Sequence, residues 1–169
     1  MGITSPEIQS PEQLFVHKLG AALTMEQTIL GMLEKLQQEA LDSTLKRDLK
    51  EHHKETEQQI DNLHRAFEAL GERPQPQPCP TVEGLEQEGE QMIKQVDEGL
   101  VDSVILGGVI ETEHHEIAVY DGLIIKAEVM GEDDLVALFQ ENLEQEEQAL
   151  EKAIKGAEKV SKQLAKQTA

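Results

Sequence analysis

Apolar residues recur three or four positions apart along four long stretches of this sequence, and this spacing constrains the fold more than any other feature. Such spacing places the apolar side chains in one stripe along an α-helix. All six prolines lie at residues 6 and 11 or between residues 74 and 80, so the four stretches lack the residue that breaks a helix interior. The chain is therefore expected to be all-α.

A long connection is expected to separate two pairs of these helices, each pair being joined by a short turn. The segment from Glu72 to Thr81 is rich in proline and predicts an extended chain, and a short acidic helix follows it. Two antiparallel hairpins joined by one such crossover define a ferritin-like four-helix bundle. With three Phe, one Tyr and no Trp, the core must be mainly aliphatic, as is common in helix bundles. The chain is expected to form a single domain, residues 1–169, with helices at about residues 12–40, 43–70, 82–96, 100–130 and 133–165.

The charge of the chain disfavours several classes of partner. With 15 basic and 34 acidic residues the net charge is −19, which repels nucleic-acid phosphates and anionic membrane surfaces. Solvated acidic helix faces explain most of this excess without any function. No apolar run is long enough to span a bilayer, and the N-terminal segment lacks the pattern of a secretory signal. We therefore expect a cytoplasmic protein that binds neither nucleic acid nor membranes.

Ionisable residues interrupt each of the four apolar stripes. An isolated charge buried in a bundle is costly unless it has a partner or binds a metal. In the first helix Glu26 lies between Ala22 and Ile29 at the same spacing, so its carboxylate is expected to face inward. The same reasoning applies to the other three helices. The inward ionisable residues are Glu26, His52, Glu55, Glu113, Glu116 and Glu146.

These positions lie at matched distances from the two hairpin turns. Glu26 lies 15 residues before the first turn, near residue 41, and Glu55 lies 14 residues after it. Glu116 and Glu146 each lie 15 residues from the second turn. At 1.5 Å per residue, each is roughly 22 Å from its turn. If the two hairpins pack with their turns at the same end of the bundle, all six side chains meet at one level.

Five carboxylates at one level must be neutralised by cations, protonated, or turned toward solvent. Metal ions are the simplest solution, and this ligand set suits Fe or Mn best and Zn less well. Bridging carboxylates can hold two ions about 3.5 to 4 Å apart. Ferritin-like sites combine a Glu from each of two helices with Glu-x-x-His from the other two. Here the second helix reads His52-x-x-Glu55 in reversed order. Ala149 stands where a His would follow Glu146.

Several motifs occur in order along most of the chain: LFVHKL and MEQ in the first helix, EHHKET in the second, ALGERP and Cys79 at the connector, ETEHHEIAVY in the third helix and NLEQEE in the fourth. As an ordered set they resemble the YciF-like ferritin-like family of small bacterial proteins, DUF892. The resemblance implies a ferritin-like fold, a homodimer, an association with stress responses and a di-iron site comparable with that of rubrerythrin. The residues that match the family's ligands are Glu26, His52, Glu55, Glu113, Glu116 and Glu146.

Four further residues near these motifs have open interpretations. His53 and His115 stand where family members more often carry apolar or aromatic residues, and they are additional ligands, partners of ligands, or solvated histidines. Tyr120 either hydrogen-bonds a ligand carboxylate and orients it or is a plain core residue. Cys79 has no basic residue nearby in the sequence, so we expect a structural role. A single cysteine also fits a reducing compartment.

Two functions of different classes follow from this reading. In the first, two metal ions, Fe in preference to Mn or Zn, bind the six residues and react with dioxygen or peroxide, as in a ferroxidase or peroxide scavenger. In the second, the bundle is a structural or interaction protein. Its metal site or protonated carboxylates then only hold the helices together.

Overall fold

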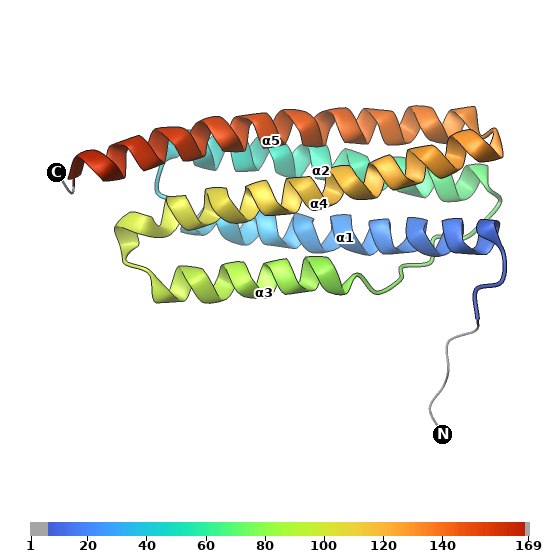
Figure 1. Cartoon of the computed structure of the whole chain (residues 1–169), viewed down its shortest axis with the longest axis horizontal. Helices are drawn as coiled ribbons and strands as arrows, with labels where there is room; N and C mark the ends of the chain where they lie inside the picture. The colour runs from blue at the N-terminus through green and yellow to red at the C-terminus, as the bar shows by residue number, and fades with distance from the viewer. Residues whose placement is uncertain (1–6, 168–169) are drawn as a thin grey trace, which may run out of the picture.

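The computed structural model describes residues 7–167, which form four long α-helices and one shorter helix packed outside them (Figure 1). The elements are α1 (Pro11–Glu39), α2 (Ser43–Ala69), α3 (Pro80–Gln95), the 3₁₀ turn η1 (Glu98–Leu100), α4 (Val101–Met130) and α5 (Asp133–Gln167). Residues 7–167 contain no β-strand. The predicted all-α, ferritin-like bundle is confirmed.

Local capping residues define where the helices of the bundle begin and end. Ser10 Oγ accepts a hydrogen bond from the backbone N–H of Gln13 at 3.1 Å, which begins α1. The carboxylate of Asp42 accepts from the N–H groups of Thr44 and Leu45 at 2.8 and 3.0 Å, which begins α2. Gly131 ends α4 with a φ of 76°, a conformation that glycine adopts without steric penalty.

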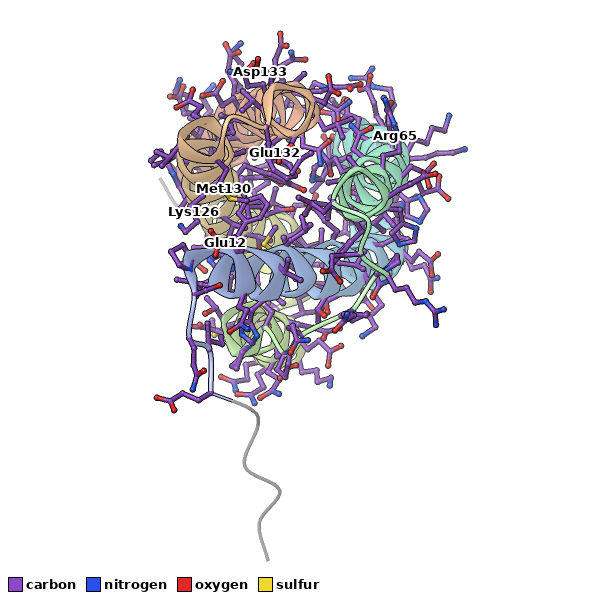
Figure 2. All side chains as sticks on the ribbon, turned by 90° about the vertical axis from the view of Figure 1, so that its right-hand side faces the viewer. Glu12, Arg65, Lys126, Met130, Glu132 and Asp133 are labelled. Atoms are coloured by element: carbon purple, nitrogen blue, oxygen red, sulfur yellow. The ribbon has the colours of Figure 1, made fainter. Side chains whose placement is uncertain are left out.

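The two hairpin turns lie at opposite ends of the bundle, so the condition under which the six side chains were predicted to meet at one level is not fulfilled. Asp102, at the start of α4, accepts hydrogen bonds from the N–H groups of Leu41 and Asp42 at 2.7 and 2.9 Å. Lys159, near the end of α5, pairs with Asp42 at 3.1 Å. The α4–α5 turn lies at the other end, which faces the viewer in Figure 2. The cause is the crossover, which runs the length of the bundle before α4 begins.

A glycine on α1 holds the extended part of this crossover. The N–H of Gln77 donates to the carbonyl of Gly20 at 3.0 Å. A Cβ at position 20 would lie 2.2 Å from the carbonyl oxygen of Gln75, so a larger residue does not fit. The following helix, α3, begins at Pro80 rather than at residue 82, because proline is compatible with the first helical turn. In both views α3 lies outside the bundle, and it packs against α4 and α1 (Figures 1 and 2).

The core changes character along the bundle. Near the α4–α5 turn it contains the buried rings of Phe15, Phe67 and Phe139, and Phe15 meets Phe139 edge to face at 6.3 Å. Toward the middle, buried polar residues replace apolar ones on α1, α2, α4 and α5. No helix within residues 7–167 combines the length and apolar character needed to cross a lipid bilayer. The polar middle of the core is therefore the feature to explain.

Candidate metal centre

Four ionisable side chains from three helices meet near the middle of the bundle, and we call them the central cluster: His52, Glu113, Glu116 and Glu146. One ligand-type atom from each lies within 4.8 Å of the other three, and all four side chains are buried. His52 Nε2 lies 3.0 Å from Glu113 Oε1 and 3.7 Å from Glu146 Oε2. Ligand atoms about 2.0 to 2.2 Å from an ion lie up to about 4.4 Å apart, so the cluster has nearly the dimensions of a coordination sphere.

Glu26 on α1 lies beside the central cluster and is fully buried. Its Oε1 accepts a hydrogen bond from the hydroxyl of Tyr120, and its Oε2 has no hydrogen-bond partner among the described residues. Burial raises the pKa of Glu26 to about 7, and the negative charge of Glu113 adds to this shift. The charge of the central cluster therefore affects the pKa of Glu26, although Glu26 is not one of the four residues whose ligand atoms lie within 4.8 Å of one another.

Glu55 lies next to His52 on the side away from the central cluster. Its Oε2 is 3.4 Å from His52 Nδ1, whereas His52 Nε2 faces Glu113 and Glu146. The Glu55 side chain is 23% exposed. A hydrogen bond from His52 lowers the pKa of Glu55. The helical spacing predicts that both side chains point to one interior spot, but the structure places the histidine ring between Glu55 and the other acids.

Burial and mutual repulsion favour protons on the carboxylates of the cluster. Burial raises the pKa of Glu116 well above its ordinary value, and the charges of Glu146 and Glu113 raise it further. The pKa of Glu146 is raised well above its ordinary value for the same reasons, burial first and then Glu26 and Glu113. Burial alone would lower the pKa of His52, but Glu113 and Glu55 raise it well above 6.5. These carboxylates cannot all ionise unless cations replace the protons.

Buried polar atoms without a hydrogen-bond partner test whether a metal fits these residues. Among the residues described, such atoms include Glu26 Oε2, His52 Nε2, Glu113 Oε2 and both side-chain oxygens of Glu116 and Glu146. His52 Nε2 lies 3.0 Å from Glu113 Oε1 but makes no hydrogen bond to it. Buried polar groups normally have partners, so this concentration requires an explanation. Carboxylate oxygens and an imidazole nitrogen are suitable ligands for Fe, Mn or Zn, so the residues present fit a metal.

A chain of buried amides connects Tyr120 with the surface. Asn142 Nδ2 donates to the Tyr120 hydroxyl at 3.0 Å, and Asn62 Nδ2 donates to Asn142 Oδ1 at 2.8 Å. Arg65, labelled on α2 in Figure 2, donates to Asn62 Oδ1 at 3.0 Å. Neither of these two asparagines was predicted to be a site residue. The available signal was Asn142, which lies four residues before Glu146 and therefore on the same face of its helix.

The remaining histidines and the cysteine lie outside the central cluster. His53 Nε2 is 3.3 Å from Oε1 of the exposed Glu34, so this histidine bridges α1 and α2 near the surface. His115 Nε2 is 3.9 Å from Cys79 Sγ. Burial lowers the pKa of His115. Of the three interpretations of His53, a solvated histidine agrees best with its position. Cys79 is buried against the bundle.

The fold and the site together define a class: four-helix bundles that gather buried carboxylates and a histidine at mid-length in a group able to hold metal. Residues 10–166 match the family described as a domain of unknown function, DUF892. The chain belongs to this family, which confirms the resemblance seen in the sequence motifs.

Individual relatives agree with this assignment. Over 137 residues the chain is 28% identical to protein YciF of Escherichia coli (strain K12), covering 80% of this chain and 82% of YciF. The solved structure of the E. coli stress protein YciF has a TM-score of 0.87 at 25% identity, covering 92% of this chain and 99% of that chain. YcfI of Rhodopseudomonas palustris, described as a proposed structural protein, has a TM-score of 0.86 at 34% identity, covering 89% and 97%.

Proposed function

We propose that this protein is a di-metal carboxylate protein that binds two iron ions and reacts with dioxygen or peroxide in a stress response. The observation that carries the proposal is the set of buried, unpartnered ligand atoms on His52, Glu113, Glu116 and Glu146. Two bound ferrous ions would supply the electrons for reducing dioxygen or peroxide. Mn or Zn are the other ions that this ligand set suits.

The charge of the buried acids favours two ions over one. When ionised, the fully or almost fully buried Glu26, Glu113, Glu116 and Glu146 carry four negative charges, which two divalent cations balance. With one divalent cation, two of these acids would have to keep their protons or stay ionised at a cost of several kcal/mol each, whereas two cations let all four serve as ligands. We therefore assign these four acids and His52 as the ligands.

Glu55 and Tyr120 have supporting roles in this proposal. Glu55 accepts the Nδ1–H of His52, which leaves Nε2 as the neutral ligand nitrogen, because the partner of one ring nitrogen fixes the state of the other. Tyr120 donates to Glu26 Oε1 and so orients that carboxylate, leaving Oε2 for an ion. Glu55, first expected to be a ligand, is thus assigned to position His52.

The alternative is a structural protein in which the metal only holds the helices together. The description of the R. palustris relative as a proposed structural protein favours this alternative. The two functions differ in one measurable property, which is whether bound ferrous iron is oxidised faster than in buffer. The cytoplasmic location, the homodimer and the absence of nucleic-acid binding stay predictions.

The test measures metal content by mass spectrometry after purification without chelators, in the wild type and in Glu146→Gln. Glu147→Gln is the matched control, because this neighbouring acid is exposed on the same helix. We expect about two ions per chain in the wild type and the control and a large loss in Glu146→Gln. Aerobic ferrous titration should then show accelerated oxidation in the wild type and in Glu147→Gln. Bound iron without acceleration would support the structural alternative, and no metal uptake by the wild type would refute the site.

A further inference from the structure

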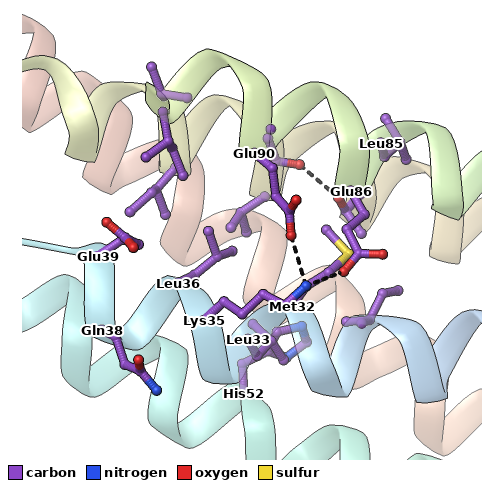
Figure 3. A pocket seen from close by; sticks show the side chains of 18 of the residues that line it. Met32, Leu33, Lys35, Leu36, Gln38, Glu39, His52, Leu85, Glu86 and Glu90 are labelled. Atoms are coloured by element: carbon purple, nitrogen blue, oxygen red, sulfur yellow. Dashed lines mark hydrogen bonds and ion pairs between the residues drawn. The ribbon is translucent and has the colours of Figure 1, made fainter. Parts of the chain in front are cut away.

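An apolar pocket of about 480 Å³ lies between α1, α3 and α4 (Figure 3). Its volume is within the range of about 300 to 1,000 Å³ that is usual for small-molecule sites. The apolar residues that line it come from all three helices and include Ile29, Met32, Leu33, Leu36, Ile93 and Ile105. The crossover therefore does more than connect the two hairpins, because α3 forms one wall of a binding cavity.

The pocket reaches the central cluster. His52 and Glu113 both line it, and both are buried. His52 Nε2 and Glu113 Oε2 have no hydrogen-bond partner within residues 7–167. In Figure 3 the ring of His52 lies below the side chains of α1 and α3 that form the walls. A molecule in the pocket could therefore place a polar end beside the proposed metal ligands while its body contacts apolar walls.

Two glycines in helix interiors border open space in the wall of this pocket. Gly89 of α3 and Gly108 of α4 both line it, and a Cβ at either position would meet no atom within 4 Å. Neither glycine has a positive φ, and neither allows a close approach of two backbones. Glycine inside a helix costs about 1 kcal/mol relative to alanine. Open space in the pocket is the structural feature that these two positions share.

The charged groups around the pocket do not favour a charged ligand. At the rim, Lys35 Nζ lies 2.8 Å from carboxylate oxygens of Glu86 and Glu90, so this lysine is already matched (Figure 3). The other two charged residues there, Glu39 and Lys94, have opposite charges. At the inner end, Glu113 would repel an anionic group. Glu113 would attract a cationic end, but the proposed metal ions compete for the same carboxylate. The pocket thus suits an apolar molecule whose polar end is uncharged.

We propose that this pocket binds a linear aliphatic molecule with an uncharged, oxygen-bearing end directed at His52 and Glu113. The choice of substrate rests on the proposed function. Among aliphatic molecules with an uncharged, oxygen-bearing end, alkyl hydroperoxides are the ones that a peroxide-reducing site consumes. Their reduction to an alcohol and water breaks the O–O bond and consumes two protons and two electrons, and two bound ferrous ions would supply these electrons. The substrate class is therefore an alkyl hydroperoxide in addition to hydrogen peroxide.

Calorimetric titration with decan-1-ol, an unreactive probe, tests the binding step on the full-length protein. We expect binding of one molecule per chain to the wild type, and weakening by at least about tenfold, or 1.4 kcal/mol, in Gly108→Leu, which fills the pocket. Gly107→Leu is the matched control, because it makes the same change at an exposed position of α4 that does not line the pocket. Decanoate should bind more weakly than decan-1-ol.

A second pair of variants covers the case in which Gly108→Leu does not fold. Gly89→Leu blocks the opposite wall, and Gly84→Leu places the same side chain at an exposed position of α3. No binding of decan-1-ol to the wild type, or equal weakening in blocking and control variants, would overturn the proposal. So would preferential binding of decanoate.

The reaction step needs a separate readout. The rate of ferrous oxidation by decyl hydroperoxide, divided by the rate with hydrogen peroxide, should fall at least about tenfold in Gly108→Leu and not in Gly107→Leu. An unchanged ratio would reject the hydroperoxide as substrate. Glu146→Gln distinguishes the two proposals, because it should lose metal but keep the binding of decan-1-ol. A wild type that binds decan-1-ol but no iron would refute the proposed function and leave the pocket assignment intact.

Discussion

Tyr120 on α4 donates its hydroxyl hydrogen to Oε1 of Glu26 on α1, and both side chains are fully buried. The same hydroxyl accepts a hydrogen bond from Asn142 on α5 at 3.0 Å. Tyr120 thus links three helices at the level of the central cluster. Its phenol keeps one oxygen of Glu26 occupied, while the other oxygen has no partner among the described residues.

Replacing Tyr120 by Phe should lower the stability of the metal-free protein by about 1 to 3 kcal/mol. The ring is retained, but Glu26 Oε1 loses its donor and Asn142 loses an acceptor in a buried site. Urea unfolding followed by circular dichroism measures this difference. Metal affinity should also fall by about 10- to 100-fold, because Glu26 is no longer oriented. An unchanged unfolding free energy would show that the hydrogen bond contributes nothing to stability.

The metal-free protein should lose stability as the pH rises from about 4.5 to above 7. Burial raises the pKa of Glu26 from 4.5 to about 7, so the folded state holds this proton more tightly than the unfolded state. The stabilisation is complete below the unfolded pKa and is lost as the pH rises through the folded one. The raised pKa values of Glu116, Glu146 and His52 act in the same direction. Glu26 alone accounts for a change on the order of 3 kcal/mol.

Urea unfolding at a series of pH values in the presence of a chelator measures this dependence. The lowered pKa values of Asp42 and Glu55 act in the opposite sense, but only as the pH falls below about 4 to 4.5. Glu26→Gln should flatten the profile between pH 4.5 and 7. Stability that rises across this interval in the wild type would contradict the assignment of buried, proton-binding carboxylates.

Asp102→Ala should destabilise the protein by about 1 kcal/mol, because the N–H groups of Leu41 and Asp42 lose a charged acceptor that joins α4 to the first turn. The effect is modest because water can replace the carboxylate at this partly exposed position. Asp121→Ala, an exposed change on the same helix, is the control and should be neutral or slightly stabilising. Thermal unfolding compares the wild type with the two variants. Equal unfolding midpoints for Asp102→Ala and Asp121→Ala would argue against a stabilising contact between Asp102 and the first turn.

Gly20→Ala should destabilise the protein by about 1 to 3 kcal/mol even though alanine is the better helix former. The added Cβ would overlap the carbonyl oxygen of Gln75 and push the crossover away from α1. Gly31→Ala is the matched control on the same helix, because its Cβ would meet no atom within 4 Å. The control should gain up to about 1 kcal/mol in urea unfolding. A gain of the same size for Gly20→Ala would mean that the crossover moves without cost.

The helices and the inward direction of most site residues were predictable because they depend on local periodicity. A helix repeats every 3.6 residues, so Glu26 between Ala22 and Ile29 must face the core wherever the neighbouring helices lie. Stop and start residues such as Asp42 and Gly131 act within a few positions of themselves. This local information sufficed for the fold class.

The prediction that the six ionisable side chains lie at one level of the bundle assumed that both hairpin turns lie at the same end. The structure contradicts this assumption. The two turns lie at opposite ends, yet Glu26, Glu116 and Glu146 still come close together. The reason is that these residues lie near the middle of helices of similar length. A residue at mid-length stays at the same level whichever way its hairpin points, so the count from the turns could not reveal the error.

The sequence by itself determined which side chains each helix turns inward, because helical periodicity is a property of one segment. Tertiary structure alone decided that Glu55 lies behind His52, that the amides of Asn62 and Asn142 continue from Tyr120, and that α3 leaves a pocket beside the cluster. These features depend on the rotation and separation of helices far apart in the chain. Those quantities are set by the packing of many side chains at once, and no short sequence pattern records them.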